Sequence, residues 1–297
     1  MNTKQQTKPN FVSACLIFTF LFLSYSASVS ADEEENEREF DYLENSEKGP
    51  SHWGDLKMDW SACKNGVLQS PIDLSSQGVK IVNKAGELKK TYKPCDAILR
   101  NRGHDISLKW HNCDAGLINI NGTEYSLQQV HWHSPSEHTI NGARYALELH
   151  MVHHSTDRNF NHSVAVIGLL YKLGAPDAFL SKLITNVTSM ADEMQEREVG
   201  VIDPNMIGID GKQYYRYIGS LTVPPCTEGV IWTMNKMIRT VSIDQVLALR
   251  LAVHDSQMQD LCSHSITDRS NFTTPTDEFP AYDIPYSKAP KLESQHR

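Results

Sequence analysis

The chain has 297 residues, 40% of them hydrophobic and 22% charged, which is enough for one large or two ordinary globular domains. Its formal net charge is -8 at pH 7, and the acidic excess lies mainly in residues 32–47, so the rest of the chain is close to neutral. These values exclude the strongly basic surface of a typical nucleic-acid-binding protein, and we expect no nucleic-acid partner.

Residues 1–31 have the features of a secretory signal peptide. Lys4 and Lys8 precede an apolar run over 11–23, and small residues follow up to Ala31. The apolar run is short for a membrane-spanning helix, and no second run of that kind follows. We therefore predict a secretory-pathway protein with no membrane span after cleavage. The expected destination is extracellular or apoplastic, with onward delivery to a plastid compartment as the alternative.

Residues 32–48 follow as an acidic leader. Because this segment is rich in like charges and poor in apolar residues, we predict that it is solvated and disordered. From Gly49 onward the composition changes to that of a globular domain, with short apolar segments separated by Gly, Pro, Asn and Asp.

The predicted strands cover 106–110, 127–133, 146–153, 164–171 and 229–234, which have strand length and β-rich composition. Asn121-Gly122 and Asn141-Gly142 lie between alternating runs and predict hairpin-type turns. The predicted fold class is therefore mainly β, with a sheet built mostly from antiparallel neighbours.

Two helices are also predicted. From Pro176, apolar residues recur at helical spacing as far as Val187, with the proline in the first turn. Ser242 and Gln245 form a capping-box pattern at the start of the second helix. Beyond it, residues 257–297 are polar and lack periodicity, so we expect a divergent, disordered tail after a globular domain over 49–256.

Cysteines and glycosylation sequons agree with secretion. An odd number of cysteines remains after the signal peptide, and spacing alone leaves the pairing of Cys63, Cys95, Cys113, Cys226 and Cys262 open, with Cys95–Cys113 as one candidate. The N-x-S/T sequons, which predict a glycoprotein, are at Asn121, Asn161, Asn186 and Asn271.

Three histidines are the leading candidates for a functional site. His131 and His133 are two positions apart in a predicted strand, so their side chains point to the same face of a sheet. His150 lies in the next predicted strand, on the face that also carries Glu148 and Val152. If the two strands are neighbours, three imidazoles converge and leave one coordination position open. That arrangement is typical of a catalytic zinc site and not of a structural one.

Polar residues on the same strand faces support this interpretation. Gln129 precedes His131 by two positions, and Glu148 precedes His150 in the same way, so each can accept a hydrogen bond that fixes a ligand tautomer. The alternative metal site is a helical zinc pair made by His150 and His154. It lacks the glutamate of an H-E-x-x-H motif, and the alternation around His150 favours a strand.

The order and spacing of seven motifs resemble those of the α-class carbonic anhydrases. The resemblance covers roughly His52 to Asp255, and the sequence of residues 131–138 is similar to that of the plant secretory branch of the class. The motifs are Ser51-His52-Trp53-Gly54, Gln69-Ser70-Pro71-Ile72-Asp73, Asn101-Arg102-Gly103-His104, Gln129-Val130-His131-Trp132-His133, Ser136-Glu137-His138, Glu148-Leu149-His150-Met151-Val152-His153 and Gly219-Ser220-Leu221-Thr222-Val223-Pro224-Pro225.

This resemblance implies a fold, a cofactor and a reaction. The fold would be that of the α-carbonic anhydrases, a large twisted, mostly antiparallel sheet with a few peripheral helices. His131, His133 and His150 would bind Zn2+, and a zinc-bound hydroxide would hydrate carbon dioxide reversibly to bicarbonate and a proton. The expected partner is therefore a small-molecule substrate, CO2 or bicarbonate, while the oligomeric state stays open.

The resemblance also assigns roles around the metal. Thr222 would accept a hydrogen bond from the hydroxide and donate its own to Glu137, because a carboxylate without a proton can only accept. His104 matches the family's proton shuttle, and histidine titrates close to neutral pH. Cys63 and Cys226 match a disulfide of secreted members. The apolar wall for CO2 would be formed by Val152, Val166, Leu221, Val223, Val230 and Trp232.

Two departures from the family pattern bear on activity, and the second leads to an alternative function. Val223 follows Thr222 where many members have a second threonine, so we expect altered turnover or inhibitor affinity. The family's Asn-x-Arg-Pro-like segment after the last helix is absent from residues 255–262, and by analogy its backbone supports His133. The alternative is therefore a protein with the carbonic-anhydrase fold but weak or no activity, which serves in storage or binding.

Overall fold

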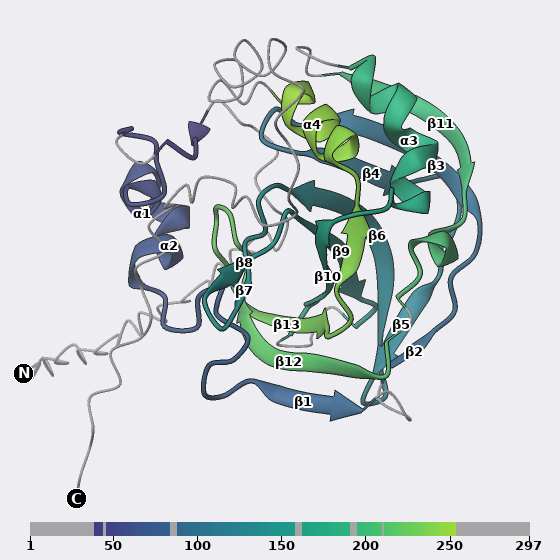
Figure 1. Cartoon of the computed structure of the whole chain (residues 1–297). Coiled ribbons are helices and arrows are strands. Elements are labelled where there is room, and N and C mark those ends of the chain that lie inside the picture. The colour runs from purple at the N-terminus through teal and green to yellow at the C-terminus, as the bar shows by residue number, and fades with distance from the viewer. Residues whose placement is uncertain are drawn as a thin grey trace, which may run out of the picture. The chain divides into compact units, whose positions relative to one another are not determined.

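A sheet of 12 strands makes up most of the described structure (Figure 1). The structure is a computed structural model, and it describes residues 39–43, 46–83, 88–157, 162–190, 195–209 and 211–253. The predicted signal peptide over 1–31 and the predicted tail over 257–297 lie outside the described residues.

The strand order confirms the predicted fold class. The sheet runs β1-β12-β13-β10-β9-β6-β4-β3-β11, with β14 paired to β10 and β5 paired to β2 and β6, while β7 and β8 form a separate pair. Only β10 pairs in parallel, with β13 and β14, among the described strands. The strands are β1 (Lys80–Asn83), β2 (Leu88–Lys90), β3 (Cys95–Asn101), β4 (Ile106–Trp110), β5 (Leu117–Ile120), β6 (Thr123–His133), β7 (Thr139–Ile140), β8 (Ala143–Arg144), β9 (Leu147–Ser155), β10 (Val164–Leu173), β11 (Glu196–Ile202), β12 (Gln213–Ser220), β13 (Glu228–Asn235) and β14 (Arg239–Val241).

Helices lie outside the sheet (Figure 1). They are α1 (Trp53–Leu56), α2 (Ala62–Asn65), α3 (Ala178–Thr188) and α4 (Ile243–Ala252), with the short 3-10 helices η2 (Met58–Trp60) and η3 (Pro204–Ile207). Both predicted helices are confirmed, including the capping box of Ser242 and Gln245. The predicted start at Pro176 is wrong, because Asp177 is the N-cap and accepts a hydrogen bond from the Leu180 N–H at 2.8 Å. None of the described helices has the length and apolar character needed to cross a bilayer.

Helices α3 and α4 cover one face of the strands that carry the candidate site. Phe179 of α3 stacks on Trp132 of β6 with ring centroids 6.2 Å apart, and Leu249 of α4 belongs to the same buried cluster. Since neighbouring residues of a strand point to opposite faces, the residues between these core positions face away from the helices. One face of β6 and β9 is therefore core, and the other is free for polar side chains.

The two predicted hairpin turns are confirmed. Asn121-Gly122 joins β5 to β6, and Asn141-Gly142 joins β7 to β8. Both asparagines have a φ of 52° and both glycines also have positive φ, the conformation that tight hairpin turns require.

The predicted disorder of residues 32–48 is wrong for its last part. Phe40 is 1% exposed and packs edge-on against Trp53, with ring centroids 5.4 Å apart. The Trp53 Nε1–H donates to the carbonyl oxygens of Asp41 and Lys48 at 3.1 and 3.0 Å. Tyr42 packs on Trp53 as well, with ring centroids 5.6 Å apart, and the acidic composition of the leader hid these two aromatic residues.

Two disulfides link the described residues. Cys63 and Cys226 are joined with an S–S distance of 2.03 Å and a sequence separation of 163, as the family resemblance implies. Cys95 and Cys113 form the second, a pairing that spacing alone leaves open. The first disulfide joins α2 to the segment between β12 and β13, which also contains Thr222.

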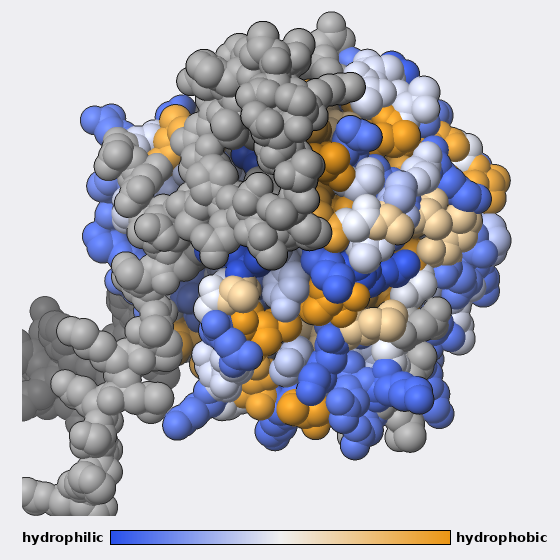
Figure 2. All heavy atoms as spheres, viewed as in Figure 1, coloured by the Kyte–Doolittle hydropathy of each residue, from blue (hydrophilic) through white to orange (hydrophobic). Residues whose placement is uncertain are grey.

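The exposed face in Figure 2 mixes hydrophilic and hydrophobic residues, with the hydrophobic ones in several separate groups. Scattered apolar residues are ordinary on a protein surface, and only a large contiguous patch would indicate a docking face. The buried polar residues of the sheet are therefore the stronger candidates for a functional site.

Candidate metal centre

The three candidate histidines lie on two neighbouring strands. His131 and His133 are at the end of β6, His150 is in β9, and the two strands are antiparallel. His131 lies directly opposite His150, and His133 lies opposite Glu148. The three imidazole rings converge, with centroid separations of 4.8, 5.0 and 4.7 Å.

A β-bulge in β6, between Leu127 and Gln129, decides which residues face the site. Before the bulge the odd-numbered Leu127 packs in the core, and after it the even-numbered Val130 does. Because the extra residue shifts the alternation by one, odd-numbered residues such as His131 then face away from the core.

Hydrogen bonds orient two of the rings. His131 Nδ1 lies 3.0 Å from Gln129 Oε1, and His150 Nε2 lies 2.7 Å from Glu148 Oε1. Both oxygens can only accept, so the proton of each neutral ring is on the nitrogen that faces them. The opposite nitrogens, Nε2 of His131 and Nδ1 of His150, are then unprotonated, yet they lie 3.1 Å apart. Two lone pairs at that distance repel each other, and a cation bound between them would remove the repulsion.

The third histidine completes the donor set. His133 Nε2 is buried and makes no hydrogen bond within the described part of the chain. One ligand nitrogen from each of the three histidines lies within 4.8 Å of the others. Nitrogens bound at about 2.0–2.1 Å to one tetrahedral zinc are about 3.3 Å apart, close to the separation seen here between His131 and His150. The residues present therefore fit a three-histidine zinc site.

Burial keeps these ligands in the form that binds a metal. It lowers the pKa of His133 to about 3 and that of His131 well below 6.5, although the charge of Asp105 raises both pKa values in part. The imidazoles are thus neutral at physiological pH, and neutral imidazole is the metal-binding form.

Glu148 is the centre of a hydrogen-bond network beside the ligands. Its Oε2 accepts from the backbone N–H groups of Glu137 and His138 at 2.9 and 2.8 Å. Its Oε1 lies 2.6 Å from His138 Nδ1, in addition to its contact with His150. The single carboxylate therefore fixes one ligand ring and the segment that carries Glu137.

The network continues to residues that sequence reasoning missed. His138 Nε2 lies 2.6 Å from the Tyr217 hydroxyl, which lies 2.8 Å from Ser70 Oγ. The motif Ser136-Glu137-His138 contains His138, but nothing in the motif predicts its contact with Tyr217. Tyr217 is separated from His138 by 79 positions, so only the folded sheet shows the pairing.

Glu137 and Thr222 are both buried near the ligands. Glu137 Oε2 is 3.5 Å from His133 Nε2 and 3.9 Å from His150 Nε2. Thr222 lies between β12 and β13 and is 3% exposed. The described residues contain no hydrogen bond between Thr222 and Glu137, so the bond that the resemblance implies stays a prediction.

Five of the six predicted pocket residues form one buried cluster. They are Val152, Val166, Leu221, Val230 and Trp232. The Trp232 ring lies 4.8 Å from that of His150, which places the cluster beside the metal ligands. Val223 does not belong to it, because it packs instead with Phe40, Trp53 and Cys226.

His104 lies in the turn between β3 and β4 and is more enclosed than a shuttle requires. Its side chain is 3% exposed, and its ring centroid lies 5.2 Å from Phe40 and 6.5 Å from Tyr42. Burial lowers the pKa of His104 to about 4, and the nearby Asp105 opposes this shift only in part. The resemblance predicts a shuttle that titrates near neutral pH, and the structure differs because the segment around Phe40 covers the ring.

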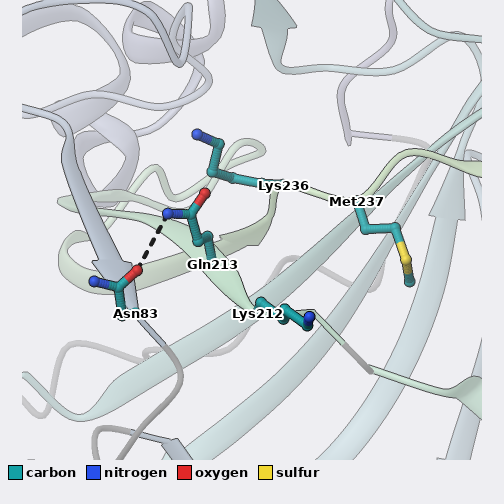
Figure 3. A pocket seen from close by; sticks show the side chains of 5 residues that line it. All are labelled: Asn83, Lys212, Gln213, Lys236 and Met237. Carbon is teal, nitrogen blue, oxygen red and sulfur yellow. Dashed lines mark hydrogen bonds between the residues drawn. The ribbon is translucent and has the colours of Figure 1, made fainter.

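An open depression of about 550 Å3 lies at the end of β1, the start of β12 and the residues after β13 (Figure 3). Gln213 donates a hydrogen bond to Asn83 Oδ1 there at 3.1 Å, and the remaining lining residues are Lys212, Lys236 and Met237. It contains none of the candidate residues, so the metal centre is assigned to the histidine cluster alone.

Comparison with known proteins supports the resemblance. Residues 48–275 match the family model of the eukaryotic-type carbonic anhydrases. Alpha carbonic anhydrase 7 of Arabidopsis thaliana is 53% identical over 218 residues, which cover 73% of this chain and 78% of the relative. Carbonic anhydrase Nec1 of Nesocodon mauritianus is 53% identical over 219 residues, with coverages of 73% and 78%.

A solved structure shows the same fold. Dioscorin complexed with ascorbate is 43% identical and superposes with a TM-score of 0.68, covering 73% of this chain and 89% of the dioscorin chain. The α-carbonic-anhydrase fold and the resemblance to plant members of that class are confirmed. The chain belongs to the eukaryotic-type carbonic anhydrase family.

Proposed function

We propose that the chain is a zinc lyase that catalyses the reversible hydration of carbon dioxide to bicarbonate and a proton. The observation that carries this proposal is the convergence of His131, His133 and His150 from two paired strands, with two lone-pair-bearing nitrogens 3.1 Å apart. When bound, zinc supplies a water of lowered pKa, so that a hydroxide nucleophile is available at neutral pH.

The surrounding residues hold the three ligands in place. Gln129 and Glu148 fix the tautomers of His131 and His150, so that the correct nitrogen of each ring faces the metal. Glu148 also binds the backbone N–H of Glu137, which keeps that carboxylate beside the ligands. The donor set is therefore organised before the metal binds.

Thr222 and Glu137 would orient the nucleophile. A carboxylate without a proton can only accept, so the Thr222 hydroxyl must donate to Glu137 and accept from the attacking oxygen. That direction aims a lone pair of the nucleophile at the substrate carbon. Carbon dioxide is uncharged, and the buried cluster that contains Val152, Leu221 and Trp232 offers it an apolar wall.

The alternative is a member of the family with weak or no activity that serves in storage or binding. One observation favours it, because a relative with the same fold is named dioscorin and was solved as a complex with ascorbate. The alternative also rests on the family's usual C-terminal segment, which is absent from residues 255–262, a region outside the described part of the chain.

The decisive experiment compares zinc-loaded and chelator-treated protein. We expect about one zinc per chain and CO2 hydration that disappears when zinc is removed and returns when zinc is added back. The measurement is stopped-flow hydration together with the zinc content of each sample. Stoichiometric zinc without hydration above the uncatalysed rate would favour the storage or binding function.

His104→Ala is expected to slow CO2 hydration in weak buffer, because proton transfer to solvent then loses its side-chain relay. Added imidazole, which replaces the missing ring, should restore the rate. The check is the turnover number at low and high imidazole for both proteins. An unchanged rate in weak buffer would remove His104 from the mechanism.

A further inference from the structure

The turn that joins β3 to β4 contains a buried ion pair on either side of His104. The Arg102 Nε–H donates to Asp105 Oδ1 at 2.7 Å, and Arg102 Nη2 donates to Asp105 Oδ2. The Arg102 backbone N–H also donates to the Asp105 carbonyl oxygen at 3.0 Å. The two side chains are 4% and 1% exposed, so this bidentate pair is out of solvent.

The turn is fixed to the rest of the fold. The Asn101 amide donates to the carbonyl oxygens of Met190 and Ala252, at 3.2 and 2.6 Å, just past α3 and at the end of α4. Its Oδ1 accepts the backbone N–H of Gly103 at 2.8 Å, and the φ of 88° at Gly103 favours glycine. The position of Asp105 is therefore set by the fold and not by a mobile loop.

His104 faces this fixed carboxylate. Its Nε2 lies 3.8 Å from Asp105 Oδ2, just beyond hydrogen-bond distance. Both ring nitrogens are buried and neither makes a hydrogen bond of ordinary geometry within the described part of the chain, although the Arg102 backbone is close enough to favour the protonated ring. A buried polar atom without a hydrogen-bond partner destabilises the fold, so the two ring nitrogens need an explanation. After a small rotation, a protonated His104 ring would donate a hydrogen bond to the Asp105 carboxylate.

We propose that Asp105 is a positioning residue for proton transfer, because its carboxylate holds and stabilises the His104 ring when that ring carries a proton. The inference rests on the proposed function, in which His104 relays protons. In each cycle His104 accepts, at a ring nitrogen, the proton that CO2 hydration releases and gives it to buffer, while Asp105 stays ionised and Arg102 stays charged.

The charges around His104 agree with this role. Burial lowers its pKa most, Asp105 raises it, and Arg102 lowers it by a smaller amount. Tyr42 lies beside the ring from the N-terminal segment, with ring centroids 6.5 Å apart. Asp105 is thus the charged group that favours the protonated ring, and the Arg102 backbone favours it by a smaller amount.

The test is Asp105→Asn, which keeps the size of the side chain and removes its charge. The His104 titration is followed by NMR, with His104→Ala identifying the resonance. An opposite charge within about 4–6 Å shifts a pKa by roughly 1–3 units. We therefore expect the pH midpoint of His104 to fall by at least about one unit, which is a tenfold loss of proton affinity. Hydration in weak buffer should fall roughly three- to tenfold and recover with imidazole.

A second variant covers the case in which Asp105→Asn fails to fold, because it leaves the Arg102 charge buried without its carboxylate. The double variant Arg102→Gln/Asp105→Asn removes both charges and should shift the His104 midpoint in the same direction by a smaller amount. The matched control is Asp177→Asn, which removes a carboxylate paired with Arg239 at the start of α3. It should leave the His104 midpoint and the weak-buffer rate unchanged.

Three outcomes are distinguishable. A His104 midpoint that stays the same or rises in Asp105→Asn overturns the inference, even if the protein hydrates CO2 normally. A lower midpoint together with a slower rate in weak buffer and an unchanged zinc content supports it. If zinc-loaded wild-type protein shows no hydration, the proposed function fails, and the NMR titration still decides whether Asp105 stabilises the protonated ring.

Discussion

Replacing His131 with alanine is expected to lower CO2 hydration by more than about 100-fold and to reduce the zinc content below one per chain. His131 lies opposite His150 in the strand register and provides one of the two nitrogens that are 3.1 Å apart. Loss of a residue that only supports a ligand typically costs about 10- to 100-fold in affinity or activity, so loss of a ligand should exceed that range. The measurements are zinc per chain after dialysis and hydration by stopped flow.

His111→Ala is the matched control for this variant. His111 lies outside the cluster, and its Nε2 is 3.0 Å from Glu198 Oε2 on the surface. It should bind zinc and hydrate CO2 as the wild type does. Full zinc occupancy and full activity in His131→Ala would show that the assigned cluster is not the metal centre.

Glu148→Gln is expected to reduce both zinc affinity and stability. The carboxylate accepts hydrogen bonds at both oxygens, whereas the glutamine side chain has only one acceptor and places an NH2 group against existing donors. Zinc affinity should fall about 10- to 100-fold. Breaking a buried charged network should lower the free energy of unfolding by about 3–5 kcal/mol. Zinc competition titration and urea denaturation measure the two effects.

The stability effect of Glu148→Gln should depend on pH. Burial works to raise the pKa of Glu148, but the adjacent His138 and His150 lower it, and the pKa ends well below its ordinary value of 4.5. A carboxyl whose pKa is lowered by folding stabilises the protein above its unfolded pKa, and this contribution is lost as the pH falls towards the folded pKa. The difference in unfolding free energy between wild type and variant should therefore shrink below pH 4.5.

Glu196→Gln provides the control, because Glu196 pairs with Arg100 on the surface. Exposed ion pairs contribute about 0–1 kcal/mol, so this variant should unfold nearly like the wild type at every pH. A Glu148→Gln protein that matches Glu196→Gln in zinc affinity and stability would contradict the role assigned to the network.

The parts of the fold that the sequence predicts are those with a strong local pattern. The strand at β9 and the capped helix at α4 follow from alternation and from the Ser242–Gln245 capping box. β1 and β11 lie at the two ends of the main sheet order and consist mainly of exposed or half-buried residues. An edge strand with few core positions carries little hydrophobic alternation, so these strands were not among the predicted segments.

The same distinction holds for the site. The convergence of His131 and His133 could be predicted because a spacing of two on a strand is local information. The links from His138 to Tyr217 and Ser70 join distant parts of the chain, and only the strand order brings them together. The covering of His104 by Phe40 was missed for a different reason, because the charge of the surrounding leader masked a single buried ring.

The bulge in β6 determines which side chains of the following residues face the metal site. One extra residue near Gln128 sets the phase in which the following side chains alternate. Deleting it would turn Val130 towards the polar side and His131 into the apolar core, although every downstream residue would keep its identity. Substitutions along β6 therefore act one side chain at a time, whereas a single insertion or deletion before His131 would displace the whole ligand face. Tolerance to length change in this strand should be far lower than tolerance to change in composition.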